Sequence, residues 1–245
     1  MISPAPIAEH LSRIARLPLM TRLLGRAMAL GYRLLRKDRY DDFRFECVRD
    51  LHFVVTPSVF NPKVPRTGEF LASQIDSRLV DRTSDVLDMG TGSGVCALFA
   101  AKYARRVVAV DINAAAVRCA RVNALLNHLE RYVEVRHGDL FAAVPGERFD
   151  LVLFNPPFVR GTPQDDRDRA WRSNDVAERF AAGLRNHLKP AGYALVLLST
   201  FGDGRIFLEE FCKQRFEISA LAERRFVNER LTVFKLKPMG PQSES

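Results

Sequence analysis

The stretch that decides the fold is Asp88-Met89-Gly90-Thr91-Gly92-Ser93-Gly94, which follows the apolar pair Val86-Leu87. Apolar residues at helical spacing then continue from Val95 to Tyr103. A strand, a three-glycine turn and a helix in this order form a ligand-binding element, because the glycines let the turn close tightly and let a ligand lie against the main chain. The first N–H groups of the helix add unpaired donors at the same place.

The glycine spacing narrows the class of ligand. It reads G-x-G-x-G, whereas the dinucleotide fingerprint needs G-x-G-x-x-G, and its third glycine would fall on Val95. This difference argues against a nicotinamide or flavin cofactor. Asp111 ends the apolar run Val107–Val110 about twenty residues after the glycines, where an acidic residue would hold a ribose diol.

A second motif follows the apolar run Leu151–Phe154 and reads Asn155-Pro156-Pro157-Phe158. Together with the glycine loop and Asp111, it resembles the Rossmann-like, S-adenosylmethionine-dependent methyltransferases. Within them the chain is similar to the N-P-P-[FY] branch, which methylates planar amino groups and includes the HemK-type protein-glutamine N5-methyltransferases and several base N-methyltransferases. The resemblance implies an α/β fold: a seven-stranded, mostly parallel sheet with helices on both faces and one antiparallel strand.

The resemblance also implies that S-adenosyl-L-methionine is the cofactor and that its site lies at successive strand ends. The loop around its methionine and ribose would comprise Asp88, Gly90, Thr91, Gly92, Ser93 and Gly94. Asp111, followed by Ile112, matches the ribose ligand, and Asp139, followed by Leu140, lies where the family accepts a hydrogen bond from adenine. A single strand-end aspartate is usually a turn former or cap. Three of them at successive strand ends favour a binding site.

The proline motif predicts the acceptor site. Pro156 and Pro157 lack backbone donors and stiffen the turn. The Asn155 side-chain oxygen and the Pro156 carbonyl could hold the two N–H groups of an amide or aromatic amine, and Phe158 could pack on its flat face. We therefore assign Asn155, Pro156 and Phe158 to catalysis and the whole motif to substrate binding, with no metal. Asn155 is also expected to border the cofactor. The alternative is a proline turn that merely ends a buried strand.

The composition indicates which cellular compartment and which kinds of binding partner fit the chain. The 245 residues are 47% hydrophobic and 27% charged, with a formal net charge of +8. The four cysteines show neither zinc-ligand spacing nor a disulfide framework, which fits a reducing, cytoplasmic setting. We expect no signal peptide and no membrane span. The positive charge favours an acidic partner such as RNA, a ribosomal particle or an anionic lipid surface, although a basic cytosolic protein without such a partner fits equally.

The chain divides into an extension over residues 1–66, a methyltransferase domain over 67–238 and a tail over 239–245. Leu19 to Lys37 predicts an amphipathic helix that either packs on the domain or faces RNA or, as a peripheral contact, a membrane surface. Phe43–Val48 and Leu51–Val55 predict a hairpin, as HemK-type enzymes carry. The following Phe60–Phe70 is similar to their "IPRPDTE" segment but lacks the acidic residue before the threonine.

From Thr67 onward, apolar strands alternate with amphipathic helices, which predicts a parallel sheet covered on both faces. The expected helices are 68–79, 95–103, 114–126, 175–188 and 205–214, and the expected strands are 85–89, 107–111, 133–136, 151–154, 193–199, 218–225 and 231–237. The last two strands should pair antiparallel. In helix 114–126 we expect four residues to face inward: Val117, Ala120, Ala124 and Leu125. Asn174 is the expected cap of helix 175–188.

The segment Ala170–Asp175 resembles the "W-x-G-G" approach to the next helix in HemK-type proteins, with Arg172 and Ser173 in place of small residues. Trp171 would anchor the polar loop 162–169 or contact the substrate. Our first expectation is an N-methyltransferase that acts on a glutamine side chain of a translation factor or ribosomal protein. The alternatives are N-methylation of an exocyclic base amine in RNA or DNA, a small-molecule N-methyltransferase, and a non-catalytic binding protein that kept the fold.

Overall fold

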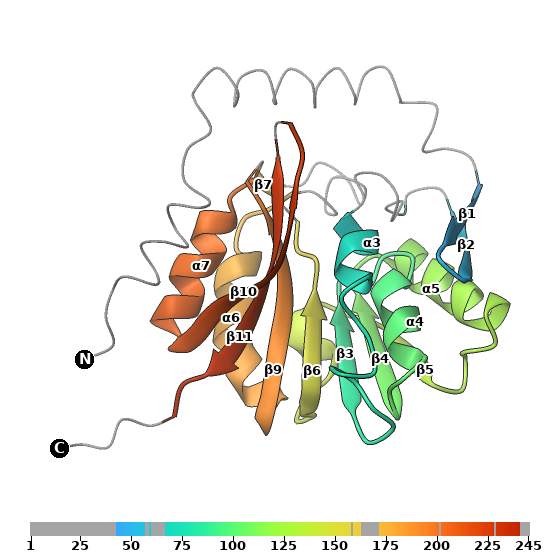
Figure 1. The fold of residues 1–245 in the computed structure, drawn as a ribbon, viewed down its shortest axis with the longest axis horizontal. Coiled ribbons are helices and arrows are strands. Elements are labelled where there is room, and N and C mark those ends of the chain that lie inside the picture. The colour runs from blue at the N-terminus through green and yellow to red at the C-terminus, as the bar shows by residue number, and fades with distance from the viewer. Residues whose placement is uncertain are drawn as a thin grey trace.

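The computed structural model describes residues 43–56, 59, 67–157, 159–162, 172–200, 202–227 and 229–240. Its centre is a seven-stranded sheet with the strand order β10-β11-β9-β6-β3-β4-β5 (Figure 1). The strands are β3 (Asp85–Met89), β4 (Arg106–Asp111), β5 (Val133–His137), β6 (Phe149–Phe154), β9 (Leu188–Ser199), β10 (Phe216–Arg225) and β11 (Arg230–Pro238). Only β11 is reversed within this sheet, since it pairs antiparallel with both β10 and β9. The predicted sheet with one antiparallel strand is confirmed.

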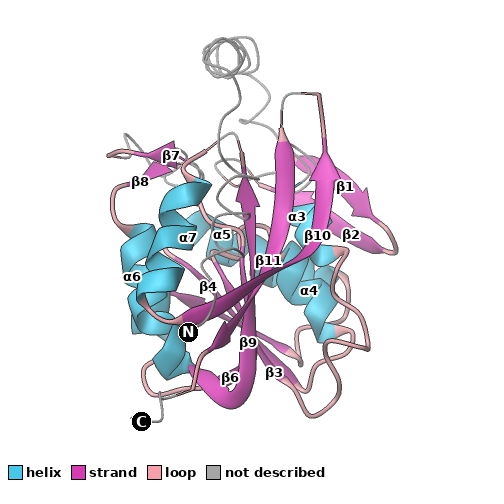
Figure 2. Cartoon of the chain, turned by 60° about the vertical axis from the view of Figure 1, so that its left-hand side comes forward, coloured by secondary structure: helices cyan, strands magenta, loops and turns pink. Residues whose placement is uncertain are grey.

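Helices cover both faces because the buried strands are apolar on both sides. Val86 packs with α3 (Thr67–Ala72), α4 (Val95–Ala101) and α5 (Ala114–Leu126). Its neighbour Leu87 packs with α6 (Val176–Leu184) and α7 (Gly204–Lys213) on the other face. Figure 2 shows these two helical layers on opposite sides of the sheet. Among the helices that the structure describes, none combines the length and the apolar character that crossing a bilayer requires.

The predicted hairpin is present as β1 (Arg44–Val48) and β2 (Leu51–Val55), which pair antiparallel. It packs against α5 through two asparagine side chains. Asn123 bonds both the N–H and the C=O of Val54, and Asn127 does the same at His52. The expected helix over 19–37, the segment 60–66, Phe158 and the loop 163–171 with Trp171 lie outside the described residues.

Two expected helices were too long. The helix expected over 68–79 ends at Ala72. The Ser73 hydroxyl and the Gln74 amide both donate hydrogen bonds to the Phe70 carbonyl, which competes with continuation of the helix. The Asp76 carboxylate then accepts from the Arg78 N–H and forms a turn. The helix expected over 175–188 ends at Leu184, followed by the 3₁₀ turn Arg185–His187. Strand β9 then begins at Leu188, which already pairs with Phe149 of β6.

Two expected side-chain roles were also wrong. Asp175, not Asn174, occupies the N-cap position of α6, and the Asn174 amide instead donates to the Thr162 hydroxyl at 3.0 Å. Leu125 is 59% exposed, whereas Val117, Ala120 and Ala124 are buried. The buried face of α5 is centred on Ala116, Ala120 and Asn123, as its burial pattern shows. Leu125 lies beyond that face, because each residue advances about 100° around the helix.

Candidate functional site

The glycine loop joins the end of β3 to the start of α4. The Thr91 N–H donates to the Val110 carbonyl at 3.0 Å, which fixes the loop against β4. Gly92 and Gly94 both have positive φ, at 58° and 87°, a backbone conformation that side chains disfavour. The turn therefore needs glycine for its geometry, and at Gly92 it leaves bare main chain facing open space.

Two buried carboxylates hold this loop. Asp88 Oδ2 accepts from the Thr91 hydroxyl at 2.6 Å and from the Ala97 N–H at 3.0 Å. Burial raises the pKa of Asp88 to about 7, and the negative charge of Asp111 adds to this. Asp111 accepts from the Gly92 N–H at 2.8 Å and from the Asn113 N–H at 2.9 Å. Burial raises the pKa of Asp111 too, although these two hydrogen bonds oppose the shift.

A cleft of about 480 Å³ opens where these strand ends meet. It is lined by twelve of the residues predicted from the sequence: Asp88, Gly90, Thr91, Gly92, Ser93, Asp111, Ile112, Asp139, Leu140, Asn155, Pro156 and Pro157. Gly94 is not part of the lining, because it lies beneath the loop, close to Leu98 and Ala120. The glycine loop, the acidic strand ends and the proline motif thus share one cavity.

Asn155 is held at the wall of this cleft by α3. Its Nδ2 donates to the hydroxyl of Thr67, a fully buried residue, at 3.2 Å. Its Oδ1 is buried and has no hydrogen-bond partner among the described residues. Such an oxygen carries a desolvation cost unless a donor reaches it. The amide is therefore oriented by the protein, and its oxygen has no donor among the described residues.

The structure adds residues to the cleft that the sequence did not indicate. Arg179 of α6 lines it and pairs with Asp139 at 2.7 Å, so one charge at the expected adenine end is already matched. Arg172 and Ser173, noted as replacing small residues, also line it. Leu140, next to Asp139, has a positive φ of 49°, which is unusual for a branched residue. The Arg179 pairing joins residues forty positions apart, so no local pattern could predict it.

Alanine substitutions at Gly92 and at Gly94 should lower the stability of the protein by different amounts. Gly92→Ala is expected to lower the free energy of unfolding by about 1 kcal/mol, for the left-handed backbone alone. In Gly94→Ala the new Cβ would also lie 3.1 Å from Leu98 Cδ1 and 3.2 Å from Ala120 Cβ. That crowding should bring the loss to about 2–3 kcal/mol. Urea unfolding of both variants measures the difference, and equal losses would contradict this account of the loop.

Asp88→Asn should change how stability depends on pH. The native pKa of Asp88 is raised from 3.8 to about 7, so the ionised group costs stability as the pH rises through that interval. Three units correspond to about 4 kcal/mol. Both hydrogen bonds go to Oδ2, which an amide oxygen can replace. The variant should therefore gain about 4 kcal/mol over the parent between pH 4 and pH 8 in denaturant titrations. A pH-independent difference would show that Asp88 titrates normally.

Known proteins that are similar to this chain are named as methyltransferases. The chain is 34% identical over 160 residues to the release factor glutamine methyltransferase of Koribacter versatilis, covering 59% of this chain and 56% of that protein. It is 32% identical over 166 residues to a putative protein N5-glutamine methyltransferase of Methanocaldococcus jannaschii, covering 63% and 82%. The match thus spans little more than half the length of the first relative.

Solved structures support the fold. The Thermus thermophilus 16S rRNA N2 G1207 methyltransferase, solved with AdoMet and guanosine, superposes with a TM-score of 0.58 at 22% identity. The superposition covers 81% of this chain and 50% of that one. The family model named methyltransferase small domain matches residues 50–224, which is well over half of the sequence. The fold, the shared cleft and this match lead to one conclusion: the chain belongs to the methyltransferase small domain family.

Proposed function

We propose that this protein is a cytoplasmic, S-adenosylmethionine-dependent N-methyltransferase that acts on a glutamine side chain of a translation factor or ribosomal protein. The observation that carries the proposal is the Asn155 amide, whose buried, unpartnered Oδ1 shares a cleft with the glycine loop. Two relatives that are more than 30% identical bear names that specify glutamine methylation. A protein amide is also the kind of planar nitrogen that such an acceptor would hold.

The residues of the cleft fit this cofactor. S-adenosylmethionine, when bound, supplies an electrophilic methyl group on a positively charged sulfonium. Asp111 Oδ2 accepts from the Gly92 N–H and Oδ1 from the Asn113 N–H, and a carboxylate has further lone pairs that could accept from the hydroxyls of a ribose. The bare main chain at Gly92 leaves room for a ligand on the loop. Asp139 and Leu140 would border the adenine, with Arg179 holding the Asp139 carboxylate in place.

On the acceptor side, the protein's part is positioning. Asn155 Oδ1 and the Pro156 carbonyl would accept the two N–H groups of the substrate amide and so turn the nitrogen lone pair towards the methyl group. An amide nitrogen is a weak nucleophile because its lone pair is delocalised, and holding both protons favours a pyramidal nitrogen. The transfer is an in-line displacement that gains its rate from orientation and from exclusion of water at the buried Asn155 oxygen. The N–CH₃ bond would form as the S–CH₃ bond breaks, which leaves a neutral thioether. The methylated nitrogen would then lose its proton to solvent water, so no strong base is needed beforehand.

The test is direct labelling of a purified substrate. Full-length protein, methyl-labelled S-adenosylmethionine and a purified release factor are incubated, and the label is mapped by peptide mass spectrometry. We expect one methyl group on one glutamine. A lysate split into protein, RNA and small-molecule fractions extends the test to other acceptors. Label in RNA or in small molecules with none in protein would replace the substrate class and leave the mechanism standing.

The second candidate is N-methylation of an exocyclic base amine in RNA. The net charge of +8 favours it, because a basic surface attracts the phosphate backbone. The superposed Thermus protein, which shares this fold, is named as a 16S rRNA N2 methyltransferase and was solved with AdoMet and guanosine. In this candidate Asn155 would hold a base amine as it would hold an amide in the first. Ribonuclease sensitivity of the labelled product separates the two candidates.

A further inference from the structure

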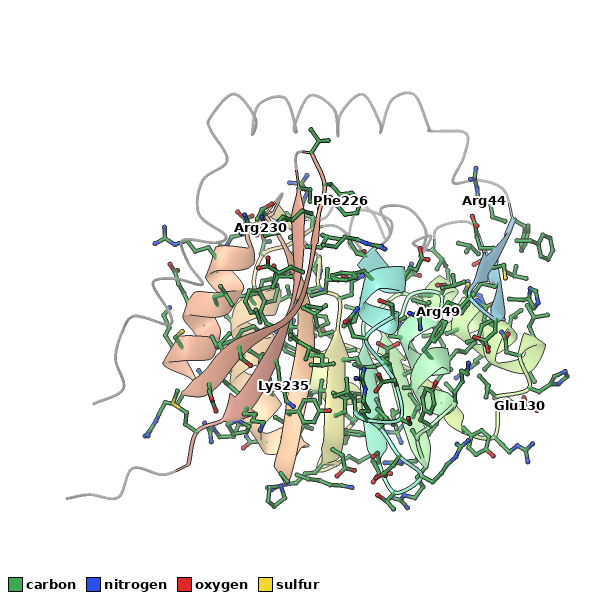
Figure 3. All side chains as sticks on the ribbon, viewed as in Figure 1. Arg44, Arg49, Glu130, Phe226, Arg230 and Lys235 are labelled. Carbon is green, nitrogen blue, oxygen red and sulfur yellow. The ribbon has the colours of Figure 1, made fainter. Side chains whose placement is uncertain are left out.

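The β10–β11 hairpin ends in a basic and apolar cluster whose residues are exposed, except for the half-buried Arg230. We call this cluster, formed by Arg224, Arg225, Phe226, Val227 and Arg230, the hairpin tip. Val227 is 98% exposed and Phe226 40% exposed, which is unusual for apolar residues next to each other. Figure 3 shows Phe226 and Arg230 at the upper end of the hairpin. Neither Phe226 nor Val227 belongs to a hydrophobic core cluster of the described residues.

The hairpin tip stands on the acceptor side of the cleft. Strand β10 runs in the direction of the parallel strands, so its end at Arg225 lies at the same sheet edge as the end of β6. The Arg224 guanidinium lies 5.5 Å from the ring centroid of Phe70 in α3. The first residue of that helix, Thr67, holds the Asn155 amide. One short helix therefore links the hairpin tip to the residue that would position the acceptor.

Hydrogen bonds within the protein hold the base of the hairpin tip in place. The Phe226 N–H donates to the Glu229 carbonyl at 2.7 Å, which closes the turn. The Glu229 carboxylate accepts from the Ser199 hydroxyl at 2.5 Å, and Arg230 N–H donates to the Thr200 hydroxyl at 2.9 Å. Both contacts join the turn to the end of β9. A pre-ordered projection loses little conformational freedom on binding, which favours its use as a contact surface.

We propose that the hairpin tip docks an acidic surface of the protein substrate, with Val227 entering an apolar pocket on that surface. This inference rests on the proposed function. Arginines pair with carboxylates through a planar fork, and arginine and aromatic residues are enriched where interfaces bind most tightly. Of the two acidic residues on this turn, Glu229 is bonded to Ser199, and Glu223 lies 3.6 Å from Arg225. A projecting valine finds no complementary group on a phosphate backbone, which favours protein over RNA.

The experiment compares two substrates and two pairs of variants in the full-length protein. The test variants are Arg225→Glu and Val227→Asp. Their matched controls are Arg78→Glu, an exposed arginine that also pairs with an acid two residues earlier, and Val122→Asp, a half-exposed valine on α5. Each is assayed on a purified release factor and on a short peptide that contains the acceptor glutamine. Binding to a ribosomal RNA fragment is measured alongside.

For both test variants we expect KM for the release factor to rise about tenfold, while kcat stays within about twofold of the parent value. This is the effect expected when a contact near the centre of an interface is lost. Kinetics on the peptide, and all kinetics of the controls, should stay at parent values. Parent-like KM in the test variants would overturn the docking proposal alone. Loss of RNA binding with unchanged protein kinetics would overturn it in favour of an RNA surface. If the parent labels no protein, the proposed function has failed and the protein partner with it.

Discussion

Asn155→Ala is expected to lower kcat for methyl transfer by about 10²–10³-fold, comparable to removing one preorganised hydrogen-bonding group from an active site. The side chain bears the buried Oδ1 that has no partner in the described part of the chain, and the substitution removes it. Affinity for S-adenosylmethionine should change by less than about threefold, because Asp111 and the glycine loop remain and the cofactor contacts stay intact. Single-turnover transfer to the release factor gives the first quantity, and isothermal titration gives the second.

A second variant separates the contact that the Asn155 oxygen would make with the substrate from the hydrogen bond that orients the Asn155 side chain. Thr67→Val keeps the shape of a fully buried side chain but removes the hydroxyl that accepts from Asn155 Nδ2 at 3.2 Å. The amide then keeps its oxygen but loses its anchor, so kcat should fall by about tenfold, well short of the alanine effect. If Asn155→Ala turns over normally, the amide does not hold the acceptor. If cofactor affinity falls as far as kcat, Asn155 serves the cofactor and not the substrate.

The strands could be predicted from the sequence because each is a short-range pattern, and the residues that line the cleft could be predicted because they belong to local motifs at the strand ends. A buried parallel strand is a continuous apolar run, and the end of such a run marks the edge where ligands bind. This was enough to place β3 at Asp85–Met89, as observed, and to bring Asp88, Asp111 and Asn155 into one cleft. The β1–β2 hairpin was predicted from the alternation of apolar and polar residues. The antiparallel pairing of the last two strands was predicted because no helix lies between Ile218–Arg225 and Leu231–Lys237.

The sequence missed one local feature and two features that depend on distant partners. The α3 helix was expected to continue to Leu79, but side-chain hydrogen bonds from Ser73 and Gln74 to the Phe70 carbonyl end it after Ala72. The other two features depend on contacts between residues far apart in the sequence. Strand β9 begins at Leu188 because it pairs with β6, which overrides the helical pattern there. The pairing of Arg179 with Asp139 crosses from α6 to the end of β5. Local propensity carries no information about such contacts.

Asn123→Ala is expected to lower the free energy of unfolding by about 3 kcal/mol or more, the loss typical of a broken network of buried hydrogen bonds. This fully buried side chain on α5 accepts from the Val54 N–H at 2.8 Å and donates to the Val54 carbonyl at 2.9 Å and the Ser93 carbonyl at 2.8 Å. The substitution leaves these three main-chain groups without that partner. Denaturant unfolding monitored by circular dichroism measures the change.

The same residue should also connect the hairpin to the cofactor loop, since it is bonded to β2 and to Ser93 at once. Asn127 is the matched control, because it bonds the N–H and C=O of His52 in the same way. Its other side-chain hydrogen bond goes to the Asn123 carbonyl, and none of its hydrogen bonds among the described residues reaches the glycine loop. Asn127→Ala should cost about 1 kcal/mol, as for a part-exposed pair of hydrogen bonds. Asn127→Ala should leave the affinity for S-adenosylmethionine at the parent value. Asn123→Ala should weaken that affinity about tenfold or more, because it loosens the glycine loop. If both variants lower stability but neither changes affinity, Asn123 only fastens the hairpin, and the glycine loop keeps its shape through Asp88 and Asp111 alone.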